Sequence, residues 1–192
     1  MSDSPDVYRV SDPQTLKAVA HPLRVRLLGA LRMDGPATAT ELAVRFGESS
    51  GSTSYHLRQL ARYGFVEEDP EQRDARERRW RSVHRYTSWS NLELGASPEG
   101  REASAFLRDR QFEVMRGNRE RFERERESWG PAWVEAAGMS DDYARLAPGS
   151  ITRLYERLSA MVREMEAEDE GSPDVQRVSL HFAAYPSRGY DR

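Results

Sequence analysis

The chain has 192 residues, of which 38% are hydrophobic and 32% charged, with a net charge of −3 that argues against nucleic-acid binding by bulk attraction. It contains no cysteine, which excludes disulfides, thiolate metal sites and thiol catalysis. No apolar run approaches the roughly 20 residues of a membrane span, so we expect a cytoplasmic protein with no membrane partner.

The N-terminal part of the chain predicts a short strand followed by helix. Residues 7–10 have the pattern of a strand, and Asp12 with Pro13 fits the N-cap and first position of a helix. Apolar residues recur at helical spacing from Leu16 to Leu31. Because Pro22 interrupts this pattern, we expect either two helices or one kinked helix.

Two short helices separated by a small polar turn are predicted next. Residues 40–46 form the first, with Thr40 as its N-cap. The turn spans residues 49–52, and the second helix ends near Tyr63. When the leucines of this second helix point inward, a polar and basic set faces outward at 100° per residue: Ser52, Tyr55, Arg58, Gln59 and Arg62.

An arginine-rich hairpin is expected directly after the second helix. Its strands cover residues 65–69 and 78–83, joined by a polar loop. Residues 72–86 contain six arginines and two acidic residues, a local charge of +4, whereas residues 91–192 hold 15 basic and 20 acidic side chains. Positive charge is therefore concentrated in the hairpin, on Arg73, Arg76, Arg78, Arg79, Arg81 and Arg85.

The C-terminal half predicts long solvated helices after a linker at residues 91–98. Residues 101–127 include 15 charged side chains and only a thin apolar stripe, so this helix needs a partner, commonly a second copy. A cleaner amphipathic helix runs from Ile151 to Met165, and alternation at residues 178–182 predicts one half-buried strand. The expected fold is mainly α with a small β-wing, an α+β class.

Two short helices followed by a basic hairpin are typical of a DNA-binding domain. In a helix-turn-helix the second helix reaches base edges, and a basic hairpin behind it lies along the sugar-phosphate backbone as a wing. Either helix alone would fit an ordinary α-hairpin with a solvated face, and the hairpin favours the DNA interpretation. The expected DNA-contacting residues are Ser52, Ser54, Tyr55, Arg58, Gln59, Arg62, Arg73, Arg76, Arg78 and Arg79.

Two segments carry a family resemblance. LKAVAHPLRVRLL at residues 16–28 resembles the opening helices of the bacterial ArsR-type winged helix-turn-helix repressors. TSYHLRQL, followed by YGFV at residues 63–66, is similar to their recognition helix and its exit into the wing. The resemblance covers about residues 12–85 and implies a symmetric homodimer that binds a pseudo-palindromic operator in double-stranded DNA, usually as a repressor. It assigns base reading to Ser52, Ser54, Tyr55 and Arg58, and backbone contacts to Arg76, Arg78 and Arg79.

The chain departs from the metal-sensing members of that family. Those members carry cysteine pairs, or a histidine and acidic cluster on the dimer helix, whereas this chain has no cysteine and residues 101–129 contain no histidine. No metal and no cofactor are therefore expected. We interpret His21 and His56 as hydrogen-bonded packing residues.

The domain organisation expected is a DNA-binding domain at residues 1–90 and a helical region at 91–192. The second region exceeds what a minimal winged-helix dimer needs, and it has two interpretations. It is a dimerisation and bracing layer, or it holds a pocket for an unknown small-molecule effector, lined by Trp89, Phe122, Trp129, Trp133 and Tyr155.

Two other function classes compete with sequence-specific DNA binding. The first is a winged-helix module that binds another protein without reading DNA sequence. The second is an enzyme built on the C-terminal half. The sequence contains no glycine-rich phosphate loop, nucleophile elbow or paired metal motif, so we do not expect an enzyme.

Overall fold

The computed structural model describes residues 6–71 and 78–188. They form two compact units, the first ending at Arg110 and the second beginning at Gln111. The expected boundary followed residue 90, but the first unit extends further. The start of the long helix α6 (Pro98–Glu125) belongs to it, because Ala103 and Leu107 are buried in its core.

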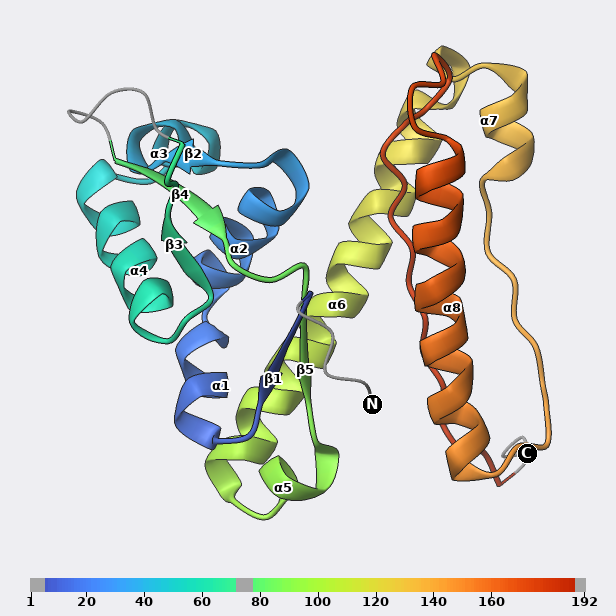
Figure 1. The fold of residues 1–192 in the computed structure, drawn as a ribbon, viewed down its shortest axis with the longest axis horizontal. Helices are drawn as coiled ribbons and strands as arrows, with labels where there is room; N and C mark the ends of the chain where they lie inside the picture. The colour runs from blue at the N-terminus through green and yellow to red at the C-terminus, as the bar shows by residue number, and fades with distance from the viewer. Residues whose placement is uncertain (1–5, 72–77, 189–192) are drawn as a thin grey trace. The chain divides into compact units, whose positions relative to one another are not determined.

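The first unit combines helices with two small sheets (Figure 1). Apart from α6, its elements in chain order are β1 (Val7–Val10), α1 (Pro13–Val19), α2 (Pro22–Asp34), β2 (Ala37–Thr38), α3 (Ala39–Phe46), α4 (Ser50–Arg62), β3 (Val66–Glu68), β4 (Arg79–Ser82), β5 (Tyr86–Trp89) and α5 (Asn91–Gly95). The predicted α+β class is confirmed, and α5 occupies part of the expected linker.

Capping side chains explain where the N-terminal helices begin. The Asp12 carboxylate accepts a hydrogen bond from the Thr15 amide at 2.8 Å, so Asp12 caps α1 as predicted. His21 caps α2 through Nδ1, which accepts from the Leu23 amide at 3.2 Å. Pro22 stands at the first position of α2, so the proline separates two helices.

The structure corrects two helix starts. Thr38, not Thr40, caps α3, because only Thr38 has a glutamate three residues later to complete a capping box. The turn before α4 is shorter than predicted. The Ser49 hydroxyl accepts from the Ser52 amide at 3.1 Å, which lets the helix begin at Ser50.

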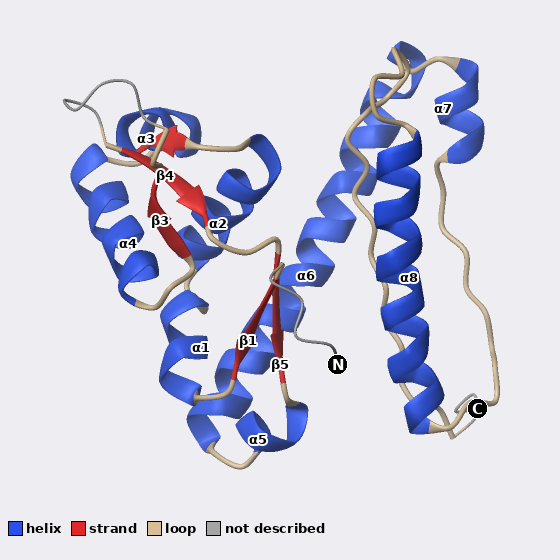
Figure 2. Ribbon diagram, viewed as in Figure 1, coloured by secondary structure: helices blue, strands red, loops and turns tan. Residues whose placement is uncertain are grey.

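The sheets connect segments that are distant in the sequence (Figure 2). Strand β4 lies between β2 and β3 and is antiparallel to both, which confirms the predicted hairpin. The N-terminal strand β1 pairs in parallel with β5. Arg32 of α2 donates to the His84 carbonyl at 3.0 Å and to the Thr87 hydroxyl at 2.8 Å, which anchors the segment between the sheets. Desolvation by burial lowers the pKa of Arg32 to about 10.

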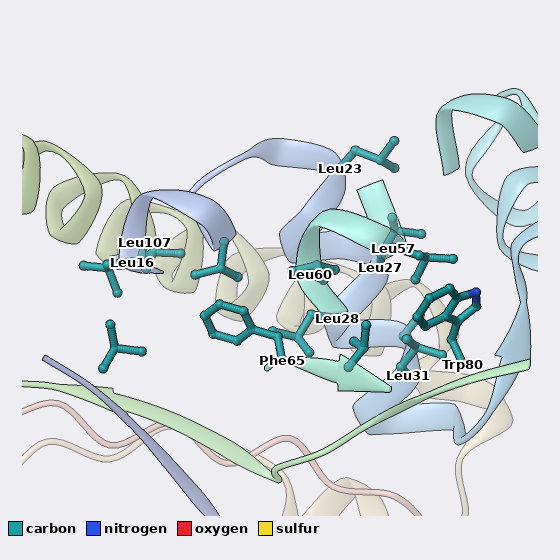
Figure 3. Packing of buried hydrophobic residues seen from close by; sticks show 14 of the residues in the cluster. Leu16, Leu23, Leu27, Leu28, Leu31, Leu57, Leu60, Phe65, Trp80 and Leu107 are labelled. Carbon is teal, nitrogen blue, oxygen red and sulfur yellow. The ribbon is translucent and has the colours of Figure 1, made fainter. Parts of the chain in front are cut away.

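A single apolar core holds this unit together (Figure 3). It joins leucines of α1, α2 and α4 to Phe65, Trp80 of the wing, and the start of α6. Tyr8 of β1 covers this core: its ring meets Phe65 edge-on at 5.0 Å, and its hydroxyl donates to the Tyr63 carbonyl at 2.9 Å. Strand β1 is thereby packed against the end of α4.

The second unit contains the rest of α6, η1 (Arg126–Ser128), α7 (Pro131–Ala136) and α8 (Pro148–Glu168). The strand predicted at residues 178–182 is wrong. No described strand lies beside this segment, and Val178 and Leu180 are 55% and 52% exposed. An unpaired strand leaves its backbone groups without partners, so alternation alone does not form one. Within the described residues, no helix combines the length and apolar character needed to cross a membrane.

Two glycines of α6 are expected to respond oppositely to alanine. A Cβ on Gly100 would lie 2.1 Å from the Leu94 carbonyl oxygen, whereas a Cβ on Gly117 would meet nothing within 4 Å. Gly100→Ala should lower the free energy of unfolding by about 1–3 kcal/mol through overpacking. Gly117→Ala should raise it by about 0.5–1 kcal/mol through helix propensity. Urea denaturation measures both, and equal effects of the two variants would contradict the packing at Gly100.

Candidate nucleic-acid interface

Helix α4 has one buried face and one accessible face. Thr53, Leu57 and Leu60 are completely buried. On the opposite side Tyr55 is 52% exposed, and Arg58 is exposed as well. The small residues Gly51, Ser52 and Ser54 near the start of the helix allow another molecule to approach its outer face closely. Of the outward face predicted from helical periodicity, Tyr55, Arg58 and Arg62 are exposed, whereas Ser52 and Gln59 are half-buried.

Arg79 fastens the wing to the start of α3. The Glu41 carboxylate accepts from the Thr38 amide at 2.7 Å and pairs with Arg79 Nη1 at 3.4 Å. The hydrogen bond from the Thr38 backbone, helped by the Arg79 charge, holds the pKa of Glu41 below its ordinary value. Arg79 also donates to the Pro36 carbonyl. This arginine thus links β4 to the capped end of α3, and its predicted phosphate contact stays a prediction.

The other described arginines of β4 and its approach also have acidic partners. Arg78 lies 3.1 Å from Glu68, and Arg81 lies 2.7 Å from Glu67, which stands opposite it in the β3–β4 register. The charge count over residues 72–86 did not include Glu67 and Glu68, which precede that range. Antiparallel pairing of β3 with β4 places both carboxylates beside the arginines. Such partly exposed ion pairs are weak, so a phosphate can replace the carboxylate.

A cavity of about 380 Å³ brings part of the predicted site together. Ser54 and Arg58 of α4 line it, as do Arg78 before β4 and Thr40 in the first turn of α3. Guanidinium groups, hydroxyls and a helix N-terminus all favour a phosphate oxygen. The buried ring of Trp80 forms part of the wall, with the Arg78 guanidinium 6.0 Å from its centre. Sequence reasoning did not include this tryptophan in the site.

Other predicted DNA contacts lie outside this cavity. Gln59 lines a second, larger cavity further along α4. The Arg62 guanidinium lies 5.9 Å from the Tyr63 ring centre, and Arg62 is exposed. Arg73 and Arg76 fall outside the described residues.

The five aromatic residues of the predicted effector pocket divide between the two units. Trp89 of β5 packs against the core of the first unit. In the second unit, the rings of Trp129 and Trp133 lie 6.3 Å apart, and Phe122 and Tyr155 are partly accessible. An effector pocket lined by these side chains stays a prediction.

The rings of His21, before α2, and His56, on α4, lie against each other at a tilt of 32°, with their centres 4.5 Å apart. His21 is hydrogen-bonded, as expected, through its cap of α2, whereas His56 Nδ1 has no hydrogen-bond partner among the described residues. Burial lowers the pKa of both rings, and the Arg24 charge adds to this, against a smaller opposing effect of Glu48. Within residues 6–71 and 78–188, no three metal-binding side chains gather.

The histidine pair predicts an acid-sensitive fold. Because both pKa values lie below the ordinary 6.5 in the folded state, the unfolded chain binds protons first as the pH falls. The free energy of unfolding should therefore decrease as the pH drops below about 6.5. Urea denaturation between pH 8 and pH 5 measures this. A His21→Gln/His56→Gln variant should show a smaller decrease, and an unchanged pH dependence would contradict the role of the pair.

The family comparison agrees with the placement of helices α3 and α4. Residues 19–69 match the family model of a helix-turn-helix domain. No curated protein matches the chain. Among solved structures, an ArsR family transcriptional regulator is similar at 24% identity, covering 53% of this chain and 94% of that one, with a TM-score of 0.31.

Two further regulators align over more of the chain. A transcriptional regulator from Thermotoga maritima is 14% identical, with coverage of 80% and 88% and a TM-score of 0.33. The adhesin competence repressor from Streptococcus pyogenes is 13% identical, with coverage of 80% and 91% and a TM-score of 0.33. On the strength of the family match, this chain carries a helix-turn-helix domain at residues 19–69, and strands β3 and β4 follow its second helix as a wing.

Proposed function

We propose that this protein is a sequence-specific transcriptional regulator that binds a pseudo-palindromic operator as a homodimer and acts as a repressor. The helix-turn-helix domain at residues 19–69 supports a DNA-binding regulator. We infer beyond this which residues read DNA, how two copies of the chain associate, and that binding represses transcription.

The observation that carries the proposal is the cavity shared by Ser54, Arg58 and Arg78. It lies where the recognition helix α4, the wing and the first turn of α3 meet, so one phosphate can be held by Ser54, Arg78 and Thr40, while the longer Arg58 side chain extends past it toward a base. A phosphate held there orients the accessible face of α4 toward the bases of the adjoining groove. Tyr55 and Arg58 are then the residues that read sequence.

Measurements of DNA affinity should distinguish residues that read bases from residues that contact the sugar-phosphate backbone. Arg58→Ala and Tyr55→Ala should each weaken binding to a recognised promoter fragment by about 1–3 kcal/mol, with a smaller effect on random DNA. Arg78→Ala should weaken both and reduce the slope of affinity against salt by about one per subunit. Fluorescence anisotropy at several salt concentrations measures these effects.

Arg9, an exposed arginine of β1, supplies a matched control as Arg9→Ala. This variant should bind both kinds of DNA like the wild type. If a Tyr55→Ala/Arg58→Ala variant kept wild-type preference for the promoter fragment, α4 would not be the reading helix. If the wild type showed no preference at all, the winged-helix protein-interaction module would be favoured.

The homodimer is supported by the second unit, which lacks a core of its own. No described residue after Leu107 is buried. Helix α8 nevertheless has an amphipathic sequence, and its apolar residues remain 38% to 54% exposed at Leu154, Tyr155, Met161 and Met165. A helix with such a stripe is stabilised by covering it, and we propose that a second copy of the chain does so.

Charge placed on the apolar stripe of α8 should dissociate the dimer. Leu158→Asp lies at the centre of the stripe and should raise the dimer dissociation constant at least about tenfold, because a carboxylate would have to be desolvated. Ala160→Asp on the opposite face is the matched control and should leave it unchanged. Sedimentation equilibrium measures both. A monomeric wild-type protein, or equal effects of the two variants, would contradict the proposed interface.

A further inference from the structure

The larger cavity of the first unit has a volume of about 650 Å³. Its walls come from α1, the start of α2, the end of α4 and the start of α6, through Pro13, Lys17, Arg24, Gln59, Tyr63 and Glu99 among others. This volume lies in the range of small-molecule sites. The cavity is separate from the one beside the wing, because the two have no lining residue in common.

The wall carries a cation with an unused donor. Arg24 Nε is inaccessible and has no hydrogen-bond partner among the described residues, while Nη2 donates to the Lys17 carbonyl at 3.3 Å. Because Nε is inaccessible, a ligand oxygen in the cavity would bind the Arg24 guanidinium through its Nη groups. The guanidinium is also partly desolvated, which lowers the pKa of Arg24 but leaves it charged at neutral pH.

The remaining lining residues narrow the ligand chemistry. The exposed Lys17 supplies a second positive charge, and Glu99 a single negative one. Two positive charges and one negative charge favour a monoanion over a doubly charged phosphate, which Glu99 would repel more strongly. Pro13 and the Tyr63 ring offer apolar surface for a hydrocarbon body.

We infer that this cavity binds a small organic carboxylate, with the carboxylate on Arg24 and Lys17 and its hydrocarbon part against Tyr63, and that the bound ligand weakens DNA binding. The effect on DNA rests on the proposed function. Gln59 lies on α4 and Tyr63 forms its C-terminal cap. A carboxylate that accepts a hydrogen bond from the Gln59 amide withdraws this side chain from DNA, which couples the two ligands.

Benzoate is a suitable probe, with benzamide as its neutral counterpart of the same shape. Titration of the ¹⁵N-labelled protein without DNA should shift the amide signals of Lys17, Arg24 and Tyr63. Benzamide should bind about tenfold more weakly, because charge-assisted hydrogen bonds are lost. Absence of benzoate binding, equal binding of benzamide, or shifts confined to other residues would each overturn the inference.

Substitutions of Arg24 and Lys17 test whether these two side chains bind benzoate. Arg24→Gln should weaken benzoate binding about tenfold. Lys17→Gln changes an exposed side chain, so folding is preserved, and it should weaken binding as well. Arg9→Gln, which removes an exposed arginine outside the cavity, should have no effect. Wild-type benzoate affinity in Lys17→Gln would overturn the assignment.

A DNA titration completes the test. Saturating benzoate should raise the dissociation constant for a promoter fragment about fivefold in the wild type and not in Arg24→Gln. Binding of benzoate at the cavity without any change in DNA affinity would overturn the coupling. The two hypotheses fail separately, since benzoate binding is measured without DNA and DNA binding without benzoate.

Discussion

Burial of the inner face of α4 is the constraint on which the rest of the structure depends. Thr53, Leu57 and Leu60 are completely excluded from solvent, so the helix cannot turn about its axis without exposing leucine. This fixes Tyr55 and Arg58 on the accessible side. The same core continues past Gly64, whose φ of +74° ends the helix and lets Phe65 return inward. The wing therefore begins at a position set by the packing of the recognition helix.

Electrostatic interactions in the wing region are set by individual ion pairs and not by the net charge of the chain. The chain has a net charge of −3, and Glu68, Glu41 and Glu67 pair with Arg78, Arg79 and Arg81, respectively. These pairs hold the guanidinium groups in place on a rigid sheet without neutralising them permanently, since exposed ion pairs contribute little free energy. Phosphates presented in the right geometry can replace the carboxylates. Discrimination among DNA sequences is then expected from shape and base contacts rather than from total charge.

The sequence predicted the elements that have local signals. Asp12 with Pro13, the helical repeat of α4 and the hairpin were all readable, because caps and periodicity are properties of neighbouring residues. Contacts between distant segments were not readable. Nothing local showed that β1 pairs with β5, that Arg24 lines a cavity, or that Trp80 lines the cavity beside the wing. The strand expected at residues 178–182 failed for the same reason, since a strand exists only with a partner.

We propose that two copies of α4 read two half-sites of one operator. Selection of bound fragments from a random DNA pool by the wild-type protein tests this proposal. Two-fold symmetry predicts enrichment of an inverted repeat whose half-sites are centred about 10 base pairs, or a multiple of that, apart. The Tyr55→Ala/Arg58→Ala variant should lose this enrichment. A pool that stays random with the wild-type protein, or the same repeat enriched by the variant, would contradict sequence reading by α4.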